Sequence, residues 1–258
     1  MKAIVMLRKV MLYFAGLLAI SALSISLKAQ DIANGHCLYG CPLGADSAND
    51  VIIRPIYTVS YNSQGKLADW VAYTVSTGNI GIASSLSREV KKDEFVDETL
   101  AASDFTEGSE YEFARLVPLV DFAGTPFWQD ANYSTNFVPR TRNLNQGAWY
   151  GLNWAIRNAV NRLGEVYIIS GPIFYATPVA AFLNTNDQHR VPDAFFKVIL
   201  TKNGGLSAFV LDQHTPVHVH HCDLESDIEK IELLTGLVLL PLAERSIFDN
   251  IKASLGCF

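Results

Sequence analysis

The chain has 258 residues, of which 49% are hydrophobic and 18% are charged, and its formal net charge is −6. This composition excludes a disordered or low-complexity chain, because enough apolar side chains are present to bury a large core. The negative balance excludes a protein that holds nucleic acid by bulk positive charge, so a polyanion site would have to be a local basic cleft.

The first 29 residues have the layout of a secretory signal peptide. Basic residues precede an uncharged apolar run at 10–23, and a Ser-rich stretch ends near Ala29. The run is short for a membrane span, which makes a retained N-terminal anchor the less favoured alternative. Cleavage near Ala29 would remove four of the 20 basic residues and leave 16 against 26 acidic ones, a formal −10. We expect a secreted or periplasmic protein, without a membrane anchor after cleavage, whose single domain spans 30–258.

Four cysteines follow the signal. Cys37 and Cys41 lie four positions apart near the new N-terminus, and Cys222 and Cys257 lie in the last quarter of the chain. An even number in an oxidising compartment predicts two disulfides, Cys37 with Cys41 and Cys222 with Cys257. A zinc site is the alternative, but the spacing matches no familiar ligand set.

Strands and helices are both indicated along the rest of the chain. Segments rich in β-branched and aromatic residues predict strands at Val51–Tyr61, Ala68–Ser76, Val166–Tyr175, Phe195–Thr201 and Leu206–Leu211. Turn residues at 62–65 and 202–205 predict two hairpins. Apolar spacings of three and four predict a helix at Asn145–Leu163, and a shorter helix is expected at Leu224–Thr235, ended by Gly236. Hairpins mixed with helices indicate an α+β domain.

Several segments taken in order carry a family resemblance. They are Cys37–Pro42, Asp69–Tyr73, Leu116–Leu119, Asp121–Gly124, Asn132–Asn136, Asn145–Trp149, Asp212–Pro216 and Ile231–Leu237. Together they resemble the secreted branch of the DNA/RNA non-specific endonucleases, the ββα-metal or His-Me finger nucleases. The resemblance runs from Cys37 to Cys257 and includes all four cysteines.

The resemblance implies a fold and a chemistry. It implies a ββα-metal nuclease fold in one domain, with a central antiparallel sheet and flanking helices. It implies hydrolysis of phosphodiester bonds in DNA and RNA, with a hydrated Mg²⁺ ion, or Mn²⁺ in its place, held by an Asn that falls on Asn145. Arginines that act on the phosphate fall on Arg88 and Arg157. Secreted members often dimerise, which makes a homodimer an expectation here.

Two central groups of the family differ in this chain. The family has Asp-Arg-Gly-His, whose His is the general base, and the matching stretch here is Glu112-Phe113-Ala114-Arg115. Arginine keeps its proton in proteins, so Arg115 cannot take a proton from water. The family's helix glutamate falls on the neutral Asn153. We therefore expect an altered and impaired centre on a nuclease fold.

Other interpretations of these residues stay open at this point. Asn145 could be a helix N-cap, and Glu112 could act as the base. The four histidines of His214–His221 could hold a transition metal, with His218 and His220 on one side of an extended segment, although an exposed turn is favoured. The remaining basic residues Arg88, Lys91, Lys92, Arg140 and Arg142 could form a basic rim for a polyanion or be solvated charges.

Two other functions compete with an impaired nuclease. One is a catalytically inactive module that binds nucleic acid or another phosphorylated polymer in the old cleft. The other is a structural or partner-binding protein that keeps only the scaffold.

Overall fold

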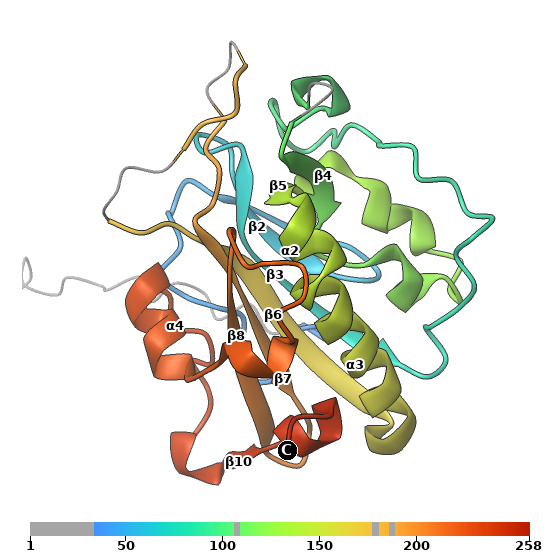
Figure 1. Ribbon diagram of the computed structural model, residues 1–258, viewed down its shortest axis with the longest axis vertical. Helices are drawn as coiled ribbons and strands as arrows, with labels where there is room; N and C mark the ends of the chain where they lie inside the picture. Colours follow the sequence, from blue (N-terminus) through green and yellow to red (C-terminus); the bar gives the residue numbers. More distant parts are fainter. Residues whose placement is uncertain (1–33, 106–108, 177–180, 186–188) are drawn as a thin grey trace, which may run out of the picture. The chain divides into compact units, whose positions relative to one another are not determined.

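One eight-stranded sheet organises the protein (Figure 1). The computed structural model describes residues 34–105, 109–176, 181–185 and 189–258. The strands of this sheet are β1 (Asp50–Ile53), β2 (Thr58–Asn62), β3 (Leu67–Ser76), β6 (Glu165–Ile173), β7 (Ala194–Leu200), β8 (Gly205–Asp212), β9 (Glu225–Ser226) and β10 (Asp249–Asn250). Their order is β1-β2-β3-β6-β7-β8-β10, with β9 beside β8. All neighbours are antiparallel except the pair β8 and β10.

The hairpins predicted at 62–65 and 202–205 both form, and they join β2 to β3 and β7 to β8. The single strand expected at Val51–Tyr61 is wrong, because the chain makes a hairpin within it. Arg54 N–H donates to Tyr57 O at 2.8 Å, and Pro55 lies in that turn. Proline cannot donate to a strand ladder, which explains the break.

Each face of the sheet carries its own core and its own helix. On one face the long helix α3 (Ala148–Leu163) buries its apolar side, including Leu152, Ile156 and Val160, against β2, β3 and β6. On the other face α4 (Ile228–Thr235) buries Ile228 and Ile231 in a second cluster, which also contains Trp70 of β3. Figure 1 shows the two helices on different sides of the sheet. The expected fold class, an α+β domain with a central sheet and flanking helices, is confirmed.

A separate two-stranded ribbon lies beside the main sheet. It consists of β4 (Tyr111–Arg115) and β5 (Phe137–Thr141), paired antiparallel with Arg115 opposite Phe137. The pattern analysis missed both strands because they are short and because β5 contains Pro139, which argues against a strand. This ribbon matters for function because β4 carries the stretch that matches the family's catalytic motif.

The helix expected at Asn145–Leu163 forms as two helices. The short α2 (Arg142–Gln146) ends at Gly147, and α3 begins at Ala148. At Gly147 two backbone segments come close, the 213–221 loop and α2. A Cβ at this position would lie 2.6 Å from Val217 O in the loop and 2.7 Å from Asn143 O in α2. Only glycine fits this junction, and the resulting bend separates Asn145 from the axis of α3.

The second predicted helix begins later than expected. Residues 221–224 form a 3-10 turn, and Glu225–Ser226 is strand β9, so α4 starts at Ile228. Pairing with β8 competes with the helix for these residues and wins. The end of the helix is confirmed, since Gly236 takes a left-handed conformation with φ of 74°.

Both disulfides expected from the sequence form. Cys37 is bonded to Cys41 and Cys222 to Cys257, which removes the thiolates that a zinc site would need. The predicted signal peptide falls on residues 1–29, which lie outside the described residues, and it stays a prediction. Within the described residues, no helix combines the length and apolarity needed to span a membrane.

The close approach at Gly147 gives a stability prediction. Changing Gly147→Ala should lower the free energy of unfolding by about 1–3 kcal/mol, because the new methyl group meets two backbone carbonyls that cannot move independently. The matched control is Gly151→Ala in α3, where the nearest atom is His221 Nδ1 at 3.5 Å. That control should be neutral or stabilising by up to about 1 kcal/mol from helix propensity. Urea unfolding followed by circular dichroism measures both; equal effects would contradict the assigned junction.

Candidate functional site

Arg115 stands at the end of β4, and the resemblance described above assigns it to the position of the family's general base. Its guanidinium is held in place by three hydrogen bonds: Nε donates to Ala131 O at 3.2 Å, and Nη2 donates to Asn132 Oδ1 at 2.6 Å and Arg88 O at 3.3 Å. It also lies 4.6 Å from the ring centre of Phe137. Burial and the nearby Arg88 lower the pKa of Arg115 to about 10. It therefore stays protonated at neutral pH and cannot act as a base there.

Asn145, the expected metal ligand, lies in α2 and uses both ends of its amide inside the protein. Its Nδ2 donates to Glu112 Oε2 at 2.7 Å, and its Oδ1 accepts a hydrogen bond from Arg140 Nη1 at 3.1 Å. The alternative that Asn145 is an N-cap is wrong, because Thr141 caps α2. The orientation of the amide is fixed by chemistry: a guanidinium can only donate and a carboxylate can only accept.

Glu112 joins β4 to α2. One carboxylate oxygen accepts from Asn145, and the other accepts from Arg142 Nε at 3.1 Å and Gln146 Nε2 at 2.9 Å. The side chain is 25% exposed. Three donors engage this carboxylate in the assembled site, which supports a role in holding α2 rather than the role of a base.

Arg140 is the residue that sequence reasoning placed wrongly. The sequence left it either in a basic rim for a polyanion or as a solvated charge, and both are wrong because it is fully buried. Its guanidinium carbon lies 3.6 Å from the ring centre of Trp149 and 4.6 Å from that of Phe195. Besides Asn145, Nη1 donates to Arg115 O at 3.2 Å. No salt bridge joins Arg140 to a carboxylate among the described residues.

Burial lowers the pKa of Arg140 well below its usual value, while Tyr73 and Glu112 oppose the shift. We treat the side chain as protonated, because arginine keeps its proton in proteins and the two ring faces stabilise a cation. The pattern at 137–141 gave no signal for this burial, because an arginine in a short strand reads as exposed. Trp149 and Trp70 are buried.

A second group of buried polar residues forms where α3 meets β7 and the segment that carries Asp121. Asn153 Oδ1 accepts from the fully buried Lys197 Nζ at 2.7 Å, so the residue that replaces the family's glutamate already has a cationic partner. Burial lowers the pKa of Lys197 to about 7, and the charge of Asp121 opposes the shift. Arg157 forms an ion pair with Asp121 at 2.9 Å. Lys197 carried no signal in the sequence, because β7 is read as an apolar strand.

These contacts do not fit a hydrated magnesium ion. Mg²⁺ sits about 2.0–2.1 Å from its oxygen ligands, and bound to Asn145 Oδ1 it would lie within roughly 5 Å of the Arg140 guanidinium. At an effective dielectric constant of 20, the repulsion is about 6–7 kcal/mol. The only carboxylate bonded to Asn145 among the described residues is Glu112, which is already engaged by three donors. We derive no step through a metal at this site.

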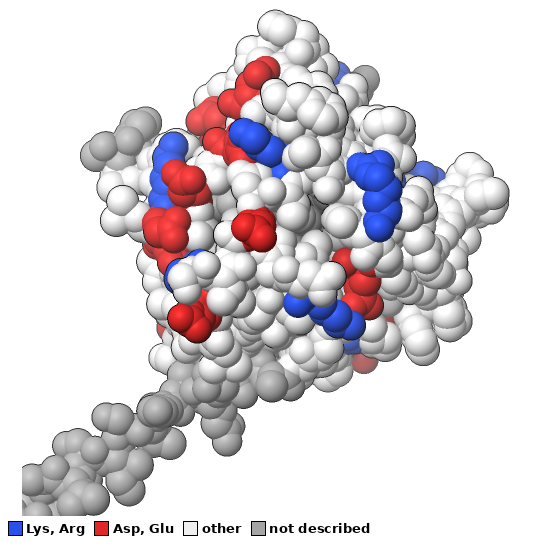
Figure 2. All heavy atoms as spheres, turned by 90° about the horizontal axis from the view of Figure 1, so that it is seen from below, with Lys and Arg blue, Asp and Glu red and all other residues white. Residues whose placement is uncertain are grey.

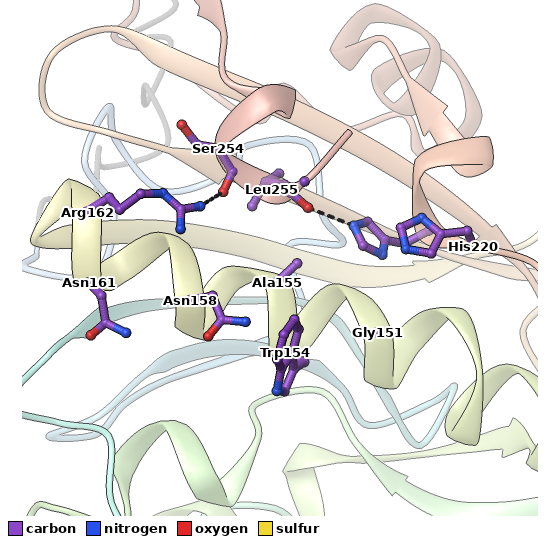
Figure 3. A pocket seen from close by; sticks show the side chains of 11 residues that line it. Gly151, Trp154, Ala155, Asn158, Asn161, Arg162, His220, Ser254 and Leu255 are labelled. Atoms are coloured by element: carbon purple, nitrogen blue, oxygen red, sulfur yellow. Dashed lines mark hydrogen bonds between the residues drawn. The ribbon is translucent and has the colours of Figure 1, made fainter. Parts of the chain in front are cut away.

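A second concave surface lies on the other side of α3 (Figure 3). This groove of about 580 Å³ runs between α3 and the C-terminal segment, and Trp154, Asn158, Arg162 and His220 line it. His220, His221 and Cys222 come close together there. Cys222 is bonded to Cys257, and His221 Nε2 lies 3.0 Å from Leu255 O, as the dashed line in Figure 3 marks. The segment 213–220 forms turns, so the alternation expected for an extended strand does not apply.

The surface charge is mixed. Figure 2 shows one face of the molecule, on which small groups of basic and acidic side chains alternate without a continuous basic area. Near Asn145, three arginines reach the surface, Arg88, Arg115 and Arg142, and Arg142 pairs with Glu112. These three arginines, the arginine cluster, are the local basic group that a polyanion could contact near Asn145.

Comparisons with known proteins identify the family of this chain. The chain matches the model of the DNA/RNA non-specific endonuclease family over residues 34–246. It is 32% identical to a nuclease of Serratia marcescens over 93% of this chain and 92% of that protein. It is 25% identical to a nuclease of Syncephalastrum racemosum, over 81% of this chain and 73% of that protein. A chain in the crystal structure of the EndoG/EndoGI complex superposes with a TM-score of 0.71 and 16% identity, over 83% of this chain and 94% of that one. The protein therefore belongs to the DNA/RNA non-specific endonuclease family.

Proposed function

We propose that this protein binds DNA and RNA through their phosphodiester groups at the arginine cluster, and that it hydrolyses them far less efficiently than its relatives. The observation that carries the proposal is Arg115, which holds the position of the general base and is fixed there by three hydrogen bonds. A guanidinium suits recognition of phosphate and does not suit proton abstraction.

The residues have separate parts in this proposal. Arg88 is exposed, and the half-buried Arg115 donates to the Arg88 backbone oxygen at 3.3 Å, so we assign both arginines to contact with a phosphate. Arg157 acts indirectly, because its charge is paired with Asp121. Asn145 and Glu112 hold α2 against β4. The resemblance also implies Mg²⁺ or Mn²⁺, and the cleavage assay includes each ion.

We also propose export, which the two disulfides support, and a homodimer by resemblance to the family.

The second candidate is a catalytically inactive nucleic-acid binding protein on the same scaffold. It is favoured by the engagement of both ends of the Asn145 amide and by the pairing of Asn153 with Lys197. Residual cleavage that is lost in Asn145→Ala would favour the impaired nuclease, and the absence of any cleavage would favour the inactive binding protein.

The cleavage prediction is quantitative. A positioned general base contributes on the order of 10²–10⁴ in rate, so purified protein with plasmid DNA or RNA and Mg²⁺ or Mn²⁺ should turn over at least about 100-fold more slowly than the Serratia marcescens nuclease. Asn145→Ala tests whether residual activity comes from this site. His214→Ala with His218→Ala tests the histidine loop that packs on Gly147. Turnover equal to that of the relative would contradict the impaired centre.

A reversion tests how much of the centre remains. Arg115→His with Asn153→Glu restores the family's side chains, but we expect a gain of less than about 10-fold, small beside the 10²–10⁴ of a working base. The new carboxylate would face Lys197 Nζ, which now lies 2.7 Å from Asn153 Oδ1. Adding Lys197→Met should raise the rate further by removing that partner. A double variant with full family activity would show that Lys197 and Arg140 do not obstruct the site.

Binding is predicted to be electrostatic and local. Arg88→Ala should weaken binding of a single-stranded oligonucleotide and reduce the slope of log K against log salt by about one. Arg88 is exposed, so its loss should leave the fold intact. Arg115→Ala should weaken binding more. Lys252→Ala is the matched control, since that lysine pairs with Glu225 beside the far edge of the sheet. Fluorescence anisotropy measures each affinity, and equal loss in the control would contradict a local site.

A further inference from the structure

We propose that the Arg140 guanidinium takes the place of the metal ion and makes this site independent of divalent cations. Arg140 Nη1 lies 3.1 Å from Asn145 Oδ1, the oxygen on which the family's metal ligand falls. The same nitrogen lies 3.2 Å from Arg115 O at the end of β4. One protein-held cation thus joins the position of the metal ligand to the position of the base.

Arg140 is buried without a carboxylate partner among the described residues. The side chain is fully buried, and its guanidinium carbon lies over the rings of Trp149 and Phe195. Its Nε and Nη2 atoms are buried and have no hydrogen-bond partner among the described residues. Desolvating a charge without pairing it is costly. The hydrogen bonds that Arg140 makes in return go to the two site groups, Asn145 and Arg115.

The amide of Asn145 is locked as a consequence. Arg140 can only donate, so Oδ1 must face it, and Glu112 as a carboxylate can only accept, so Nδ2 must face Glu112. The amide oxygen that a metal would need therefore faces a positive charge. We infer that divalent ions neither bind here nor organise α2, and that the arginine supplies the fixed positive charge instead.

Manganese binding to the full chain tests this without relying on activity. Mn²⁺ is titrated and the free ion is followed by electron paramagnetic resonance. The wild type should show no saturable site in the millimolar range, and Arg140→Lys, which keeps a cation, should behave like it. Arg140→Gln should gain one site, at least about 10-fold tighter than any wild-type binding, and the double variant Arg140→Gln with Asn145→Ala should lose it.

Two results would overturn the inference. One is a single wild-type Mn²⁺ site that Asn145→Ala abolishes. The other is a folded Arg140→Gln variant, with a wild-type circular dichroism spectrum, that gains no site.

If Arg140→Gln does not fold, the wild type alone still decides. Its melting temperature and its affinity for an oligonucleotide should each be the same in Mn²⁺ and in EDTA at equal ionic strength, the affinity within about two-fold. Binding that is 10-fold tighter in Mn²⁺ and loses this gain in Asn145→Ala would overturn the inference. The oligonucleotide measurement rests on the proposed function. No oligonucleotide binding in either buffer would contradict that function alone, and the Mn²⁺ titration and the melting temperature would still decide the inference.

Discussion

The hydrogen bond from Arg140 to Asn145 is the contact on which the whole site depends. It sets the direction of the amide, and through the amide it sets the place of Glu112 and the attachment of α2 to β4. Because a guanidinium is a permanent donor and a permanent charge, this arrangement has one stable state. A metal site needs the opposite property, an oxygen that is free to bind and release a cation.

The buried polar residues at α3 are also fixed by charged partners. Lys197 donates to Asn153 behind α3, and Arg157 pairs with Asp121 beside it. Asn153 and Arg115, which the resemblance assigns to the family's catalytic glutamate and histidine, are both hydrogen-bonded inside the protein. Buried charges of this kind stabilise little on their own, but they are expensive to leave unpaired. They keep the altered centre in one arrangement.

The fold explains why these changes are tolerated. The sheet and α3 bury a large apolar core, and two of its rings, Trp149 and Phe195, also contact Arg140. The β4–β5 ribbon and α2 stand beside that core and carry the site. Arg115 is only half-buried, so its identity can vary with little change to this packing, and the family remains recognisable over residues 34–246.

The sequence by itself determined the fold class, both hairpins, both disulfides and the family, because alternation, turn residues, paired cysteines and ordered motifs are local or collinear signals. It also predicts that Arg115 stands in place of the family's base, and this stays a prediction. Only the tertiary structure decided the burial of Arg140, the partner of Asn153 and the split of the helix at Gly147. Each of these depends on a residue far away in the chain: Phe195, Lys197 and Val217. Contacts between side chains of different helices and strands depend on how these elements pack, and the periodicity of the sequence does not predict them.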